Sequence, residues 1–199
     1  MTDAYTTYAQ EAYWGSSTSA VSLGAVVTGA PIAGEAQMTR RNVLNAEYPR
    51  LVPTRADYRV TIPQLLIGDE SEAMRQAPEA TLAVIQTDAE TALVMPAVIA
   101  GIPRQAEAGG EIVSNLNVQP RGGAVRAKAT VLAGKAITVA STDQVYVVVT
   151  SGAGAITRGS ATFTAANKIA IAQLSDTGTT VTPAAQVKGW LLSGPVATV

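Results

Sequence analysis

Carboxylates are the main residues in this chain that could do chemistry, because two more versatile side chains are missing. The 199-residue sequence contains no histidine and no cysteine. It therefore lacks the commonest general base, the commonest metal ligand and any thiolate or disulfide. Serines are present, but no histidine can activate one, and no serine stands three residues before a lysine.

Two carboxylate clusters are candidates for acid–base catalysis or for a weak calcium site. Asp69, Glu70 and Glu72 form the first, and Asp88 and Glu90 form the second. The first cluster stands at the start of a predicted helix, where carboxylates stabilise the positive end of the dipole. The second stands in a turn between two apolar segments. These positions account for the charges without catalysis. We therefore expect a protein that is not an enzyme and that needs no cofactor and no metal.

The glycine-rich and basic segments also lack the residue patterns of known phosphate-, dinucleotide- and nucleic-acid-binding sites. Gly134-Lys135 is followed by Ala136, and residue 129 is alanine, so the spacing of a phosphate-binding loop is absent. The segment SGAGAITRG, residues 151–159, has glycines without dinucleotide-binding spacing, and it is interpreted as a turn. Arg40-Arg41 could contact nucleic acid, but no aromatic residues interleave with it. A solvated loop or a salt bridge between subunits fits this pair better.

The composition indicates thin β-sheets with an uncharged surface. Charged residues make up 15% of the chain, against about 25% in ordinary globular proteins, and there is one phenylalanine. Sequences rich in Ala, Val, Thr and Gly suit sheets whose faces meet other sheets or neighbouring subunits. The formal net charge of −1 gives no general attraction to nucleic acid or membranes.

Charge is divided unevenly along the chain. Residues 1–99 carry six arginines and no lysine against eleven acidic residues, whereas residues 100–199 carry eight basic and four acidic residues. Halves of opposite sign fit either two domains or one subunit that meets its copies head to tail. No signal region opens the sequence, and the apolar run Thr91–Ile102 is too short to cross a bilayer and contains a proline. We expect a soluble protein made in the cytoplasm.

The first part of the chain predicts an arm, a strand and a long loop. Tyr5, Tyr8, Tyr13 and Trp14 cluster near the start, ahead of a strand predicted around Ala20–Thr28. Such an arm can close the domain's own core or dock on a neighbouring subunit. Residues 35–57 are polar and broken by prolines, which predicts a long loop that either contacts neighbours or is merely solvated. The loop holds four candidate contact residues: Arg40, Arg41, Arg50 and Arg55.

A helix and several patterned strands follow. Tyr58–Ile67 predicts a strand in which Pro63 places a bulge or an edge, and Glu70–Ala77 predicts one short helix capped by Asp69. Ala80–Thr87 and Thr91–Ala100 predict a hairpin. In the alternating strand 111–119, one face is apolar and the other is neutral and polar. The inward set is Ile112, Leu116 and Val118, and the polar set is Asn115, Asn117 and Gln119.

From Ala124 onward, short strands and turns recur, which predicts a small sandwich or barrel. The predicted strands are Ala127–Leu132, Ala136–Ala140, Val145–Thr150, Ser160–Thr164, Lys168–Gln173, Thr179–Thr182 and Val187–Leu192. The fold class is therefore mainly all-β. We expect a barrel- or sandwich-forming domain over 1–123 and a small β domain over 124–199, divided near Pro120–Gly123.

The order of these elements resembles the tail tube protein of long-tailed bacteriophages. The strongest local likeness is GGEIVSNLNVQPRGG, in which the strand Glu111–Gln119 follows a Gly-Glu loop and leaves through Pro120-Arg121-Gly122. The likeness covers most of residues 20–123. The segment KIAIAQLSDTGTTVTPAAQVKG is similar to small β modules that many tail proteins append.

The resemblance implies a self-assembling virion protein. Subunits of that family form stacked hexameric rings, each giving strands to a continuous inner barrel, in a tail assembled in the host cytoplasm. The partners would be copies of the chain and other tail proteins, with DNA a non-specific passenger and no membrane. A lumen that passes DNA should be neutral or acidic, which suits Asn115, Asn117 and Gln119. The arm and the 35–57 loop would reach adjacent subunits.

Other classes remain as alternatives. A capsid decoration or cement protein of a phage head would also be β-rich, and it would form trimers or bind preformed shells. A carbohydrate-binding module should show an aromatic platform, yet the C-terminal part offers only Tyr146, Phe163 and Trp190. An enzyme is disfavoured by the missing histidine and cysteine.

Overall fold

The protein is an all-β molecule, as the sequence predicts. The structure, a computed structural model, describes residues 10–25, 32–41, 50–66, 78–87, 89–101, 105–106 and 112–195. Every regular element in these ranges is a strand, sixteen in all. The predicted helix Glu70–Ala77 lies outside the described residues.

Eight of the described strands precede Gly123 and eight follow it. The first eight are β1 (Gln10–Gly15), β2 (Ala20–Ala25), β3 (Ile32–Arg41), β4 (Arg50–Leu66), β5 (Glu79–Gln86), β6 (Thr91–Gly101), β7 (Gln105–Ala106) and β8 (Ile112–Pro120). The other eight are β9 (Val125–Val131), β10 (Ile137–Thr138), β11 (Gln144–Ser151), β12 (Ala153–Arg158), β13 (Ala161–Ala166), β14 (Ala170–Gln173), β15 (Thr180–Pro183) and β16 (Lys188–Gly194).

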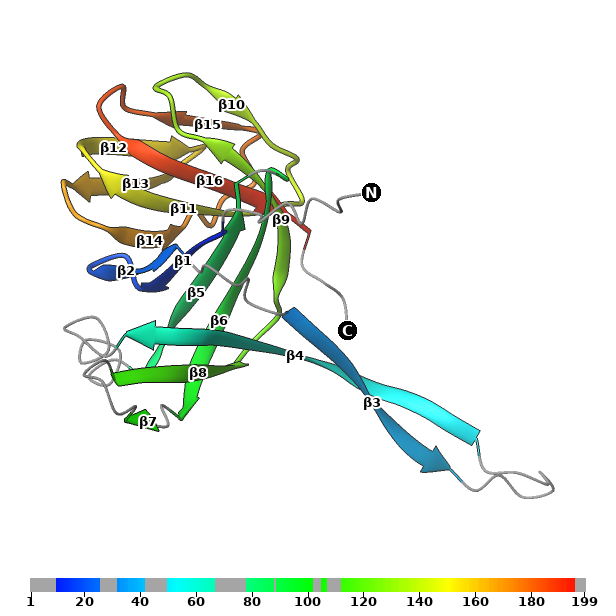
Figure 1. The fold of residues 1–199 in the computed structure, drawn as a ribbon. Helices are drawn as coiled ribbons and strands as arrows, with labels where there is room; N and C mark the ends of the chain where they lie inside the picture. Colours follow the sequence, from blue (N-terminus) through cyan, green and yellow to red (C-terminus); the bar gives the residue numbers. More distant parts are fainter. Residues whose placement is uncertain are drawn as a thin grey trace, which may run out of the picture.

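The centre of the molecule is a curled antiparallel sheet that nearly closes on itself. Its main path runs β14, β11, β16, β9, β6, β5, β1 and β2 (Figure 1). The two ends meet because the backbone N–H of Ile171 donates to the Ser16 carbonyl and that of Ala20 donates to the Ile169 carbonyl, both at 3.0 Å. Closure of this kind satisfies edge groups that would otherwise be exposed.

Several strands of this barrel are buried on both faces. On β5, Ala83 and Ile85 pack in one core while Leu82 and Val84 pack in another, and all four are fully buried. Strand β11 behaves in the same way, with Tyr146 and Val148 on one side and the valines beside them on the other. Burial on both faces explains why these strands are continuously apolar.

Three cores result from this arrangement. The barrel interior holds Tyr13, Ala83, Ile85, Ala92, Val94, Val125, Ala127, Ala129, Tyr146, Val148, Ile171 and Leu192. Outside β1, β5 and β6 lies a second core that includes Trp14, Leu23, Met95 and Val118. A third core lies between β11, β14 and β16 and a separate four-stranded sheet ordered β10, β15, β12 and β13.

The main sheet is continuous across the predicted domain boundary near Gly123. Strand β9 pairs with β6 on one side and with β16 on the other. On β9, Val125, Ala127 and Ala129 are buried and Arg126 and Lys128 are exposed, as alternation requires. The division into domains 1–123 and 124–199 stays a prediction, and no break in the sheet accompanies it in the described residues.

The segment 151–159 contains a strand that the sequence did not predict. Gly152, at φ +88°, makes the turn, and β12 follows it directly. Ile156 and Arg158 are buried on β12, while Ala153 and Ala155 are exposed. Small residues on the exposed face hid the alternation that normally identifies a strand.

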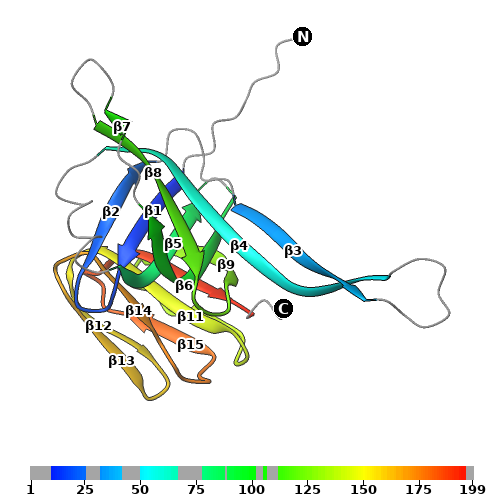
Figure 2. The same ribbon diagram turned by 90° about the horizontal axis from the view of Figure 1, so that it is seen from below.

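The long loop predicted over residues 35–57 is corrected by the structure. Strand β3 pairs along its length with the first part of β4, from Ile32 opposite Val60 to Arg41 opposite Arg50. The resulting hairpin projects away from the barrel (Figures 1 and 2). Pro53 is tolerated because it lies where the register shifts, opposite Met38. The predicted irregularity at Pro63 is confirmed by a second shift between Ile62 and Leu65.

The third core gives a matched test of burial. Val147 on β11 is fully buried, whereas Val131 on β9 is 56% exposed. Val147→Ala should lower the free energy of unfolding by about 2 kcal/mol through lost burial and a cavity. Val131→Ala should change it by less than about 0.5 kcal/mol. Urea unfolding measures both, and equal losses would contradict the assigned core.

Candidate assembly surface

The β3–β4 hairpin and β8 form an extension of the main sheet with a staggered arrangement. Val60 of β4 lies opposite Ile32 of β3 and also opposite Val118 of β8. A residue in a sheet pairs with at most one strand on each side. Since Val60 pairs with both β3 and β8, these two strands lie on opposite edges of β4. The 17-residue β4 thus links the barrel to the projecting hairpin (Figure 2).

This stagger leaves strand edges open. Strand β3 covers β4 only from Arg50 to Val60, and β8 covers it only from Val60 to Leu66. Among the described residues, no strand pairs with the outer edge of β3, nor with the β8-side edge of β4 over Arg50–Arg59. Open edges present rows of N–H and C=O groups that can add another strand.

The register of the hairpin brings two of the four predicted contact arginines opposite each other. Arg41 lies opposite Arg50, Arg40 lies opposite Leu51, and Arg55 lies opposite Gln37. The sequence predicted that the four arginines share one segment but not that strand pairing aligns Arg41 with Arg50. Their side chains lie outside the described part of the chain, so their role as contacts stays a prediction.

The polar strand predicted over 111–119 is present as β8. At its end, Val118 is 1% exposed and packs in the second core, while Gln119 is exposed. The backbone of Asn117 lies opposite Thr61 on one side and Gly101 on the other. The side chains of Asn115 and Asn117 lie outside the described residues, and the proposed lumen face is therefore untested.

Two of the predicted contact aromatics have an internal role. Tyr13 and Trp14, on β1, are 6% and 1% exposed, so in this structure they are not available to a neighbouring subunit. Tyr13 lies in the barrel and Trp14 in the second core, since successive strand residues face opposite sides. The sequence allowed two roles for these aromatic residues, packing in the domain's own core or docking on a neighbouring subunit, and the first applies to Tyr13 and Trp14. Tyr5 and Tyr8 lie outside the described residues.

A polar cluster ties the first strand to the last. Glu11 Oε2 accepts a hydrogen bond from the Tyr13 hydroxyl at 2.7 Å and another from Trp190 Nε1 at 3.1 Å. Burial, and then the hydrogen bond and charge of Glu11, raise the pKa of the Tyr13 phenol well above its usual range. The cluster bridges β1 and β16, which are not neighbours in the sheet.

The structure offers little for catalysis where it is described. Glu90 is an exposed turn residue at φ +51°, and Asp69, Glu70, Glu72 and Asp88 lie outside the described residues. Within the described ranges, no three metal-ligating side chains gather, and no helix has the length and apolar character to cross a membrane.

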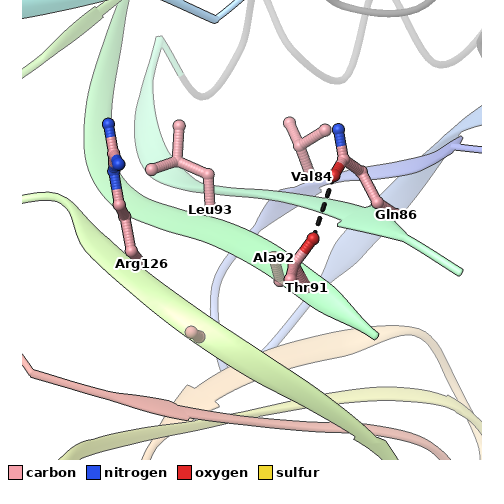
Figure 3. Close-up of a pocket in the computed structure, with 7 residues that line it drawn as sticks. Val84, Gln86, Thr91, Ala92, Leu93 and Arg126 are labelled. Carbon is pink, nitrogen blue, oxygen red and sulfur yellow. Dashed lines mark hydrogen bonds between the residues drawn. The ribbon is translucent and has the colours of Figure 1, made fainter. Parts of the chain in front are cut away.

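A depression of about 310 Å³ lies over the β5–β6 hairpin and β9. Its lining includes Val84, Leu93 and Arg126, and the Thr91 hydroxyl donates to Gln86 Oε1 at 2.9 Å (Figure 3). Among the described residues of this lining, Arg126 is the one that carries a charge.

Asp176 organises a turn of the C-terminal lobe, which we define as the four-stranded sheet with the strands β11, β14 and β16 that pack against it. Its carboxylate accepts hydrogen bonds from the Ser160 hydroxyl at 2.6 Å, the Ser160 N–H at 2.9 Å and the Gly178 N–H at 2.8 Å. These bonds, the Ser160 hydroxyl first, lower the pKa of Asp176 to about 2. Gly159, at φ +55°, leaves room for this carboxylate, since a Cβ there would lie 2.2 Å from Oδ1.

Comparison with known proteins assigns no family. No protein-family model and no curated protein matches the chain. One similar solved structure is described as the SPP1 Dit (gp 19.1) protein, a paradigm of the hub adsorption apparatus in phages that infect Gram-positive bacteria. The alignment has 9% identity, covers 94% of this chain and 95% of that one, and has a TM-score of 0.34. A score this low establishes neither a shared fold nor a shared function.

The Asp176 turn predicts a pH-dependent stability. Because the folded pKa lies below the usual 3.8, the carboxylate stabilises the fold above about pH 4, and this contribution disappears as the pH falls towards 2. Asp176→Asn should therefore be less stable than the wild type at pH 7, and the difference should shrink between pH 4 and 2. Urea unfolding across this range measures it.

Asp143→Asn is the matched control. The Asp143 carboxylate accepts only a long bond, 3.4 Å, from the Ala140 N–H. We expect a smaller loss at pH 7 from this variant. A difference between Asp176→Asn and the wild type that stays constant from pH 7 to 2 would contradict the role assigned to the ionised carboxylate.

Proposed function

We propose that this chain is a structural protein of a bacteriophage tail whose copies form stacked hexameric rings, the tail tube. The observation that supports the proposal best is the projecting β3–β4 hairpin with its open backbone edges. The resemblance of the element order and of GGEIVSNLNVQPRGG to tail tube proteins supplies the ring symmetry and the tube. The protein would act in the virion tail after assembly in the host cytoplasm.

Head-to-tail association follows from the stagger around β4. The outer edge of β3 lies on one side of the hairpin, and the open Arg50–Arg59 stretch of β4 lies on the other. Because these two open edges lie on opposite sides, the outer edge of β3 in one copy can pair with the open stretch of β4 in the next copy. A heterologous contact of this kind generates a ring when its rotation closes. Each junction would add backbone hydrogen bonds and make the sheets continuous.

Charge supports the same arrangement. The hairpin arginines would meet carboxylates of adjacent copies, because residues 1–99 carry an excess of acidic residues. Asn115, Asn117 and Gln119 would face the lumen. A lining without positive charge would let DNA pass as a non-specific passenger, since phosphates bind mainly to lysine and arginine. Copies of the chain and other tail proteins are the proposed partners, with no cofactor, catalysis or membrane.

A capsid decoration protein is the alternative. Such a protein would present the hairpin to a preformed shell and would form trimers without stacking. The two roles differ in what the purified chain does alone at high concentration.

The assembly test uses negative-stain microscopy and sedimentation of the purified chain. We expect hollow tubes or stacked rings. Arg40→Glu with Arg41→Glu should raise the concentration at which assemblies form by about tenfold or more, which corresponds to about 1.4 kcal/mol of contact free energy. The matched control is Lys135→Glu with Lys168→Glu, which changes the net charge equally at exposed turns of the C-terminal lobe.

The outcomes separate the candidates. Tubes from the wild type and the lysine control, with loss of tubes in the arginine variant, would support the proposal. Trimers that bind preformed shells and never stack would favour the decoration role. Equal assembly of both charge-reversed variants would contradict a contact through the hairpin.

A further inference from the structure

Arg158 is the one charged residue that is buried among the described residues, at 2% exposure. It lies at the end of β12, next to the two-residue turn that leads to β13. A buried cation is costly unless its donors are satisfied and its charge is compensated. The surroundings of this guanidinium therefore need an explanation.

Backbone carbonyl oxygens surround the guanidinium. Nε donates to the Gly178 carbonyl at 2.8 Å, and Nη2 donates to the Ala140 carbonyl at 3.1 Å. Nη1 donates to the carbonyls of Asp143 at 3.0 Å and Leu174 at 3.3 Å. These four oxygens, which we call the carbonyl cage, come from the segment before β11 and from the segment between β14 and β15.

No carboxylate within the described residues forms an ion pair with Arg158. The Asp143 side chain accepts from the Ala140 N–H, and the Asp176 side chain accepts from Ser160 and Gly178. The cation is therefore held by carbonyl dipoles, and the Asp176 carboxylate holds the backbone N–H of Gly178, whose carbonyl accepts from Arg158 Nε. Carbonyl oxygens carry partial negative charge, so several of them that converge on one point form a binding site for a cation.

We propose that the carbonyl cage is a guanidinium-binding site that the chain fills with its own Arg158. The planar fork of a guanidinium can donate to several separate acceptors at once, whereas an ammonium is a compact charge with three donors. When Arg158 is shortened, the cage keeps its acceptors and takes a free guanidinium ion from solution. The inference concerns the C-terminal lobe and does not depend on the proposed function.

Chemical rescue tests the cage. Arg158→Ala should lower the melting temperature by on the order of 10 °C, because it leaves buried carbonyls without donors. Methylguanidinium chloride at about 10 mM should raise the melting temperature of this variant by several degrees, through ligand binding to the folded state. The same salt should leave the wild type unchanged. Equal concentrations of sodium chloride and of urea control for ionic strength and for a neutral planar molecule.

Arg121→Ala is the matched arginine control. Arg121 is 62% exposed and pairs with Glu79 on the surface, so its removal leaves no buried cage. We expect a small change in melting temperature and no rescue. Rescue of both variants alike, or of neither despite a destabilised Arg158→Ala, would overturn the proposal.

If Arg158→Ala does not fold, two further variants test whether the carbonyl cage requires a cation. Arg158→Met keeps the length without donors and should be destabilised without rescue, and Arg158→Lys should have intermediate stability. Folding yield of Arg158→Ala in the presence of methylguanidinium, compared with urea, then replaces the melting temperature. A stability of Arg158→Met equal to that of the wild type, or equal yields in both solutes, would refute a cation requirement.

Discussion

Hydrogen bonding at strand edges is the constraint on which this structure depends. A sheet has two edges, and each carries backbone groups that need partners. The main sheet meets this need by curling until β14 reaches the β1–β2 turn, where Ile171 and Ala20 make the closing hydrogen bonds. Among the described residues, the outer edge of β3 and the Arg50–Arg59 stretch of β4 have no partner strand. These open edges are the physical reason to expect other copies.

Closure also explains the unusual composition. A barrel covered by further layers buries both faces of β5, β6 and β11, so these strands cannot alternate between polar and apolar residues. Alanine and valine dominate because layers packed on both sides leave little space for large side chains. The few large residues are shared between cores, with Trp14 and Met95 in the second core and Tyr13 and Tyr146 in the barrel interior. Glu11 then secures the barrel by bridging Tyr13 and Trp190.

The sequence predicted the fold class and most strands, because their apolar and alternating patterns are local. The strand 111–119 and the strands after Ala124 other than β12 fall in this class. Strands without such a pattern were missed. On β12 the exposed positions are alanines. Strand β3 is rich in polar and charged residues, and the first part of β4 combines charges with Pro53, which is typical of loops.

The candidate sites, like the strands, could be predicted only where the sequence signal is local. Sequence reasoning gathered the arginines of the hairpin but could not align Arg41 with Arg50, because pairing over that distance is set by the register. It placed Tyr13 and Trp14 equally well in a core or at an interface, and burial decides for the core. Nothing local marked Arg158, whose acceptors lie 15 to 20 residues away along the chain.

Hydrogen–deuterium exchange at the backbone of β3 tests the central claim most directly, because it reports on the open edge itself. In dilute solution, residues 32–41 should exchange faster than residues 79–86 of β5, which has a partner on each side. When copies associate at high concentration, protection should rise at residues 32–41 and remain unchanged in β5. Association with no gain of protection along β3 would contradict assembly through its edge.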